Sequence, residues 1–125
     1  MTALENERRN PFLEGNLAPV TEEVTAFDLE VTGTLPTDLD GRYLRNGPNP
    51  LGEVNPAKYH WFTGHGMVHG VRLRDGKAEW YRNRWVRNND VADLLNESRP
   101  ASDWPADHGQ FAANTNVIGH NGKTF

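Results

Sequence analysis

Histidine side chains are the groups in this chain best suited to hold a metal ion, because the chain contains no cysteine and therefore no thiolate ligand. His65 and His69 lie four residues apart, a spacing that on a helix would place both on one face, as in H-E-x-x-H zinc sites. His65 stands between two glycines, however, and the residues after it alternate as in a strand, which separates the pair by roughly 13 Å. That distance is too long for one ion to bridge. The chain has five histidines: His60, His65, His69, His108 and His120.

The pattern around the pair favours structural roles for both side chains. We predict that His69 packs on the inner face of a strand beside Met67 and Val71, bonded to a backbone group, and that His65 sits in a turn. The glycines nearby form a G-x-G-x-x-x-G string, but a dinucleotide cradle needs a helix N-terminus after it, and here a strand follows. We interpret these glycines as allowing positive φ or a close backbone approach where the chain enters a sheet.

Other catalytic patterns are missing or weak in the sequence. No serine lies in a G-x-S-x-G elbow, and the absence of cysteine excludes a thiol nucleophile. Several carboxylates near the front of the chain lack apolar neighbours suited to a general acid, and we predict that they are solvated. These are Glu22, Glu23, Asp38 and Asp40.

An aromatic run stands out instead, formed by Tyr59, His60, Trp61 and Phe62. Such rings could line an apolar binding site, and ordinary core packing is the alternative that the run leaves open. Taken by themselves, these residues do not specify a reaction.

The composition indicates a protein rich in turns. Among 125 residues there are 12 glycines, 8 prolines and 13 asparagines, which disfavours an all-helical fold. The net charge is -4, and the basic residues gather in the middle of the chain. Because Arg72, Arg74, Arg82 and Arg84 have strand-like spacing, we interpret them as a solvated sheet face and expect no nucleic-acid partner. No run is long and apolar enough to span a bilayer or to act as a secretory signal, so we predict a soluble, cytoplasmic protein.

Alternating apolar residues predict strands separated by tight turns. Phe27, Leu29 and Val31 predict a half-buried strand, and a second short strand at 42–45 is expected to stop where glycine and two prolines follow. Asp75-Gly76 predicts a type I′ hairpin in which Arg74 faces Lys77, Leu73 faces Ala78, Arg72 faces Glu79 and Val71 faces Trp80.

The second half of the chain predicts a short helix, a loop and another hairpin. Residues 89–97 suit one or two helical turns capped by Asn89 or Asp90, and 98–110 suit a loop carrying Trp104. Residues 116–120 predict a brief strand that enters an Asn121-Gly122 turn. Only three residues follow that turn, so we expect the chain to be the N-terminal fragment of a larger all-β protein.

Three segments of the sequence carry a resemblance to a known family. GRYLRNGPNP at 41–50, YHWFTGHGMVHGVRLRDGKAEWYRNRWVR at 59–87 and NTNVIGHNGKTF at 114–125 resemble the N-terminal quarter of the carotenoid cleavage oxygenases, which include lignostilbene dioxygenases. The resemblance covers about residues 10–125. It implies an all-β fold, the N-terminal part of a seven-bladed β-propeller that is incomplete in this chain, with a flexible arm over 1–14 and the first strands and blades over 15–125.

The same resemblance implies a reaction and a cofactor. The family cleaves a conjugated carbon-carbon double bond of a carotenoid, apocarotenoid or stilbene with O₂, using Fe(II) held by four histidines with glutamates behind several of them. The first iron histidine of the family follows the last motif seen here, so the iron site is expected downstream of residue 125. His65, His69 and His120 match family positions that are not iron ligands. We therefore predict no metal-ligating and no catalytic residue in this chain.

Phe62 is the one position that the resemblance carries over to substrate binding, where its ring would line the substrate tunnel. The full-length protein is expected to be an oxygenase that uses a hydrophobic small molecule and O₂, and this chain alone is expected to be inactive. Two alternatives remain: a non-catalytic β-propeller binding module and a small basic RNA-binding sheet. Peripheral membrane contact, the substrate and the oligomeric state stay open.

Overall fold

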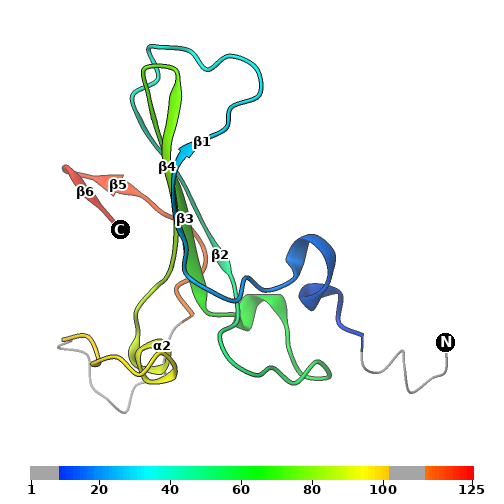
Figure 1. Ribbon diagram of the computed structural model, residues 1–125. Helices are drawn as coiled ribbons and strands as arrows, with labels where there is room; N and C mark the ends of the chain where they lie inside the picture. The colour runs from blue at the N-terminus through cyan, green and yellow to red at the C-terminus, as the bar shows by residue number, and fades with distance from the viewer. Residues whose placement is uncertain (1–8, 102–111) are drawn as a thin grey trace.

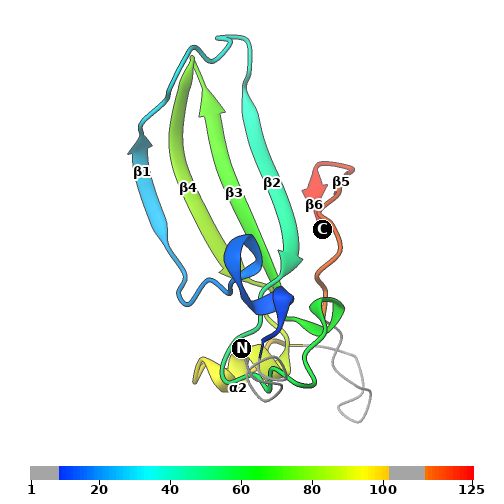
Figure 2. The ribbon, with the colours of Figure 1, turned by 90° about the vertical axis from the view of Figure 1, so that its right-hand side faces the viewer.

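Four antiparallel strands form the main sheet in the computed structural model, which describes residues 9–101 and 112–125. The sheet order is β1-β4-β3-β2, and Figure 2 shows it face on, with β1 and β2 at the two edges. A small hairpin of two further strands lies near β2, where Arg42 donates to Thr124 Oγ1 over 3.4 Å. The strands are β1 (Thr25–Leu29), β2 (Gly41–Pro48), β3 (Gly66–Arg74), β4 (Lys77–Trp85), β5 (Gly119–His120) and β6 (Lys123–Thr124).

Short helices connect and flank these strands. The 3₁₀ helices are η1 (Pro11–Leu13), η2 (Gly15–Leu17) and η3 (Trp61–Thr63), and the α-helix is α2 (Asn89–Leu94). Strands are therefore the main regular secondary structure of the described residues, as predicted, whereas the propeller ring is not contained in them. Helix α2 begins at residue 89 as predicted and ends at Leu94, but its cap is Asn88 rather than Asn89 or Asp90, because the Asn88 side chain accepts the Val91 N–H over 2.8 Å.

The Asp75-Gly76 hairpin forms as predicted near its turn. Asp75 and Gly76 have φ of 51° and 71°, which is the geometry of a type I′ turn. Arg74 faces Lys77 and Leu73 faces Ala78, but a bulge then shifts the register, so that Arg72 faces Trp80. The predicted pairs of Arg72 with Glu79 and of Val71 with Trp80 are therefore wrong. The extra residue, Glu79, binds Arg74 instead, over 2.7 Å.

Two edge strands differ from their predicted limits. Strand β2 continues through Gly47 to Pro48, because an edge strand needs no hydrogen-bond donor on its free side and so tolerates proline. Strand β1 ends at Leu29, and Asp28 has φ of 49°, which interrupts the expected alternation. Phe27, predicted to be half-buried, is 63% exposed.

The apolar core lies at the end of the sheet that meets helix α2 (Figure 1). Met67 from β3, Trp85 from β4 and Val91 from α2 are buried against one another. The indole N–H of Trp85 donates to the carbonyl oxygen of Asn49 over 2.9 Å, so the polar atom of this ring is satisfied inside the core. Three partly buried residues complete the cluster: Val20, Leu51 and Leu95.

Buried asparagines tie loops to this framework. Asn49 bonds both the N–H and the carbonyl oxygen of Val20, over 2.7 and 2.9 Å. Asn10 donates to the carbonyl oxygens of Pro56 and Tyr59. An amide side chain can satisfy backbone groups that lack a strand partner, which explains part of the high asparagine content.

No helix among the described residues is long and apolar enough to cross a membrane. The division into an arm over 1–14 and a domain over 15–125 stays a prediction, because residues 1–8 lie outside the described part of the chain. The same holds for the loop predicted to carry Trp104 and for His108, which fall within 102–111.

Candidate functional site

The aromatic run forms a tight turn that ends in helix η3. His60 caps this helix: its Nδ1 accepts the Phe62 N–H over 3.2 Å, and its carbonyl oxygen accepts the Thr63 N–H over 2.9 Å. Thr63 Oγ1 donates to the same carbonyl over 2.6 Å. His60 therefore holds the turn that presents the next two aromatic residues, Trp61 and Phe62.

The rings of this turn pack against one another at the surface. The Trp61 ring lies 6.0 Å from the Phe62 ring and 6.5 Å from the Phe12 ring, measured between centroids. Phe62 also meets the His60 ring edge-on at 5.0 Å. Phe62 nevertheless remains 70% exposed, so its ring is available for an apolar ligand.

A pocket of about 230 Å³ lies between Phe62 and the end of strand β2. Its side chains come from three segments that are far apart in sequence: β2, the aromatic turn and the stretch before β5. A second pocket of about 310 Å³ shares Trp61 with the first and reaches His69. The first pocket is lined by Asn46, Gly47, Pro48, Trp61, Phe62, Asn114 and Thr115.

Two glycines let these segments approach closely. A Cβ on Gly64 would lie 2.6 Å from Tyr59 Oη and 2.9 Å from Pro48 Cβ, and a Cβ on Gly66 would lie 2.1 Å from the carbonyl oxygen of Ala113. The sequence-based interpretation of close backbone approach is confirmed at these positions. Their φ angles are not positive, so that part of the interpretation does not apply to them.

Tyr59 places its hydroxyl next to Gly64 and stays protonated. Its hydroxyl is buried and accepts or donates no hydrogen bond among the described residues. Burial raises the pKa of Tyr59, which removes it as a base near neutral pH. We assign it a packing role against Gly64.

Both histidines of the four-residue pair make side-chain hydrogen bonds. His65 Nδ1 accepts the Leu51 N–H over 3.0 Å, so Nε2 carries the proton and donates to Asp90 Oδ2 over 2.6 Å. His69 Nδ1 lies 2.7 Å from Tyr81 Oη, so the predicted bond to a backbone group is wrong. Burial, with a smaller effect from Arg45, lowers the pKa of His69 and keeps it neutral.

The described residues contain no group of three or more His, Asp or Glu side chains that could hold a metal ion. His120 lies exposed in the β5–β6 hairpin. The described residues therefore offer no set of side chains that fits an iron ion.

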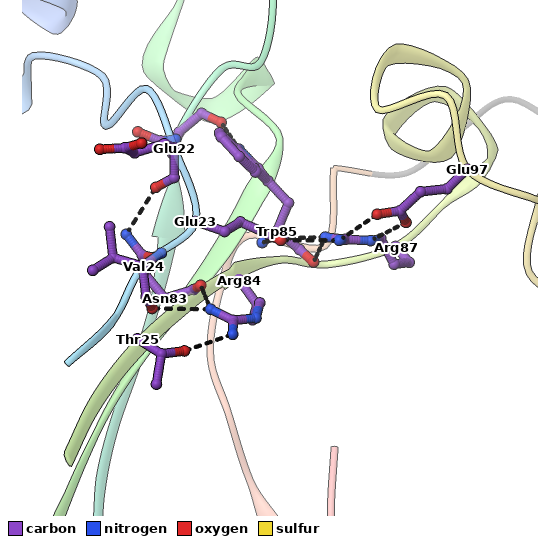
Figure 3. Close-up of polar contacts among 10 residues, drawn as sticks. Glu22, Glu23, Val24, Thr25, Asn83, Arg84, Trp85, Arg87 and Glu97 are labelled. Atoms are coloured by element: carbon purple, nitrogen blue, oxygen red, sulfur yellow. Dashed lines mark hydrogen bonds and ion pairs between the residues drawn. The ribbon is translucent and has the colours of Figure 1, made fainter. Parts of the chain in front are cut away.

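The carboxylate of Glu23 has a structural role, which corrects the prediction that it is solvated. Figure 3 shows it between Trp85 and Arg87 at the end of β4. It accepts the Trp85 N–H over 2.9 Å and pairs with both terminal nitrogens of Arg87. The hydrogen bonds from Arg87 lower the pKa of Glu23, so it is ionised and cannot serve as a general acid near neutral pH.

Comparison with known proteins gives a consistent result. Residues 17–125 match the family described as retinal pigment epithelial membrane protein. Over 125 residues the chain is 60% identical to a carotenoid cleavage oxygenase of Mycobacterium tuberculosis, covering 99% of this chain and 25% of that protein. This chain belongs to the carotenoid cleavage oxygenase family.

Other members of the family show the same coverage. An isoeugenol monooxygenase of Pseudomonas nitroreducens is 35% identical over 94% of this chain and 26% of its own length. The crystal structure of Pseudomonas brassicacearum lignostilbene dioxygenase superposes with a TM-score of 0.66 at 28% identity, covering 93% of this chain and 26% of that one. The chain thus spans about a quarter of the length of these oxygenases.

Phe62 was predicted from the sequence, but most of the pocket around it was not. Asn46, Asn114 and Thr115 line the same pocket, although they lie 16 to 53 residues from Phe62 in sequence. Each asparagine falls inside a segment that carried the family resemblance, which was the only signal that could have drawn attention to it. Nothing in the local pattern indicated that these segments meet.

Proposed function

We propose that this chain is the N-terminal part of a non-haem Fe(II) dioxygenase that cleaves a conjugated carbon-carbon double bond. The substrate is a carotenoid, an apocarotenoid or a stilbene, and O₂ supplies one oxygen atom to each of the two carbonyl products. The observation that carries this proposal is the 60% identity to a carotenoid cleavage oxygenase along nearly the whole chain.

The pocket beside Phe62 supports the same proposal. Its exposed ring and the neighbouring Trp61 offer flat apolar faces, which suit a polyene or a stilbene ring. Stacking and burial of such a substrate would gain free energy without requiring a charged partner. We therefore assign Phe62 to substrate binding in the complete protein.

In the proposed enzyme, the residues that bind the metal and the blades that complete the propeller lie outside this chain. The family reaction needs a metal that binds O₂, and four histidines outside this chain would supply its ligands. Exposed aromatic residues on the sheet, such as Phe27 and Tyr43, support the proposal that further blades of a seven-bladed propeller cover it. The cytoplasmic location and the absence of a nucleic-acid partner are parts of this proposal.

The test is cleavage by the full-length protein. The protein is loaded with Fe(II) and incubated in air with a hydroxystilbene and, separately, with an apocarotenal, and the products are separated and identified by mass spectrometry. We expect carbonyl products from at least one substrate, none without O₂, and none from residues 1–125 alone. Binding without cleavage under all these conditions would instead support a non-catalytic propeller module.

A further inference from the structure

The side-chain amide of Asn114 holds the turn that carries Phe62. Its Nδ2 donates to the carbonyl oxygen of Phe62 over 3.0 Å and to that of Gly64 over 2.8 Å. These two carbonyls lie on either side of Thr63, so one amide group is hydrogen-bonded to the turn at two points. Both hydrogens of the amide nitrogen are used.

A second amide ties Asn114 to the sheet. Asn46, in strand β2, donates through Nδ2 to the carbonyl oxygens of Ala113 and Asn116, over 2.8 and 3.2 Å. These carbonyls flank Asn114 and Thr115 in the chain. Asn46 Oδ1 is buried and accepts no hydrogen bond from a described residue, so the two donated bonds fix how this amide is turned.

The backbone before Asn114 is also held in place. Gly66 donates its N–H to the carbonyl oxygen of Ala112 over 2.8 Å, and the missing Cβ at Gly66 lets this stretch lie directly against strand β3. The stretch cannot move towards the sheet, and the amide of Asn46 prevents it from moving away. The position of Asn114 relative to β2 is therefore fixed.

We propose that Asn46 and Asn114 act in series as positioning residues, which hold Phe62 at a set distance from the floor of its pocket. By floor we mean the part of the pocket lining that comes from β2, Gly47 and Pro48, and Phe62 and Thr115 line the same pocket from the other two segments. Phe62 is mostly exposed, so packing alone does not immobilise it. This inference rests on the proposed function, because it makes the two amides determinants of affinity for an aromatic or polyene substrate.

The physical reason is preorganisation. A wall already held in the bound geometry does not have to be ordered when the substrate arrives, so less of the interaction free energy is lost on binding. Releasing the turn should weaken binding while changing the chemical step much less. The expected signature is a higher KM with a similar kcat.

Three variants of the full-length protein separate this role from a general effect on folding. Asn114→Ala removes the amide, and Asn114→Asp keeps the size of the side chain but cannot donate. Asn114 is only partly buried, so water can reach the carbonyls that these changes release. Asn116→Ala is the matched control, because it lies in the same segment and its side chain bonds no described residue.

The measurement is the dissociation constant for resveratrol, a hydroxystilbene, obtained from the quenching of tryptophan fluorescence, together with KM and kcat where cleavage is seen. We expect Asn114→Ala and Asn114→Asp to raise the dissociation constant about tenfold, because both hydrogen bonds to the turn are lost, while Asn116→Ala stays within about twofold of wild type. KM should rise by a similar factor with kcat within about threefold of wild type.

Several results would overturn the inference. These are wild-type affinity in both Asn114 variants, an equal loss in Asn116→Ala, and a wild-type protein that does not bind resveratrol. If Asn114→Ala fails to fold, the affinity of Asn114→Gln for resveratrol is measured instead. Its longer amide should displace the turn and weaken binding about threefold. Unchanged affinity in this variant would refute the positioning role. Absence of carbonyl products with intact binding would reject the proposed function alone, since the binding series does not depend on cleavage.

Discussion

Replacing Glu23 by glutamine should loosen the attachment of residues 22–25 to strand β4. The Glu23 side chain is 21% exposed and accepts three hydrogen bonds, two of them from Arg87. Asn83 and Arg84 make further bonds to this segment, as Figure 3 shows, so the segment should stay in place but open more often. Losing the carboxylate charge removes charge-assisted bonds worth about 1.5 to 3 kcal/mol.

The expected cost is near the middle of that range. Arg87 keeps a second partner, because its Nε lies 2.7 Å from Glu97 Oε2. The change therefore leaves no unpaired buried charge, which would cost about 3 to 5 kcal/mol. We expect a loss of about 2 kcal/mol, or roughly a thirtyfold rise in the local opening constant. Glu97→Gln is the matched control: Glu97 is 46% exposed, and we expect less than about 1 kcal/mol.

Hydrogen exchange of the full-length protein, followed by mass spectrometry on peptides that contain Trp85, measures this opening. The Trp85 N–H is donated to Glu23 and so reports directly on the contact. Exchange in Glu23→Gln within threefold of wild type, or a larger effect from Glu97→Gln, would refute the reasoning.

The effect should also depend on pH in a defined direction. Arg87 holds the pKa of Glu23 below its ordinary value of 4.5 in the folded protein. The stabilisation is therefore fully present above about pH 4.5 and is lost as the pH falls through the lower folded value. The difference between wild type and Glu23→Gln should shrink as the pH is lowered below 4.5, and a difference that grows there would contradict the assignment.

Three further outcomes follow from the structure. Gly66→Ala should lower the free energy of unfolding of the full-length protein, measured in urea, by about 3 kcal/mol or more, because its Cβ would meet the Ala113 carbonyl oxygen. Gly41→Ala is the control: a Cβ there has open space around it and should cost less than about 1 kcal/mol. Phe62→Ala should raise KM for a stilbene or apocarotenal about tenfold and Phe62→Tyr should not, since tyrosine keeps the ring face. Residues 1–125 alone should show no sharp cooperative melting in calorimetry, because large apolar side chains on the sheet, including Tyr43, are exposed.

The local turn chemistry was predictable from the sequence. Asp75-Gly76 and Asn121-Gly122 both adopt the positive φ values that a type I′ turn requires, and few other residue pairs do this without strain. The register beyond the first turn was not predictable, because a bulge leaves Glu79 without a strand partner, and the hydrophobic pattern does not encode such an irregularity. The continuation of β2 through Pro48 depends on its place at the sheet edge, which is a tertiary property.

The pocket, too, was predictable from the sequence only in part. The aromatic run at 59–62 was visible in the sequence, and Phe62 lies in the pocket as part of that run. Its position relative to β2 comes from asparagine side chains that bond distant carbonyls, and no periodicity or spacing encodes such contacts. The role of Glu23 was missed for the same reason, since its partner Arg87 lies 64 residues away.

The most direct test of the central claim follows the oxygen atoms. The full-length protein is incubated with the substrate that it cleaves under isotopically labelled O₂, and the carbonyl products are reduced at once to alcohols so that they cannot exchange oxygen with water. The account predicts that each of the two products carries one labelled atom. Label in only one product, or the absence of cleavage, would contradict it.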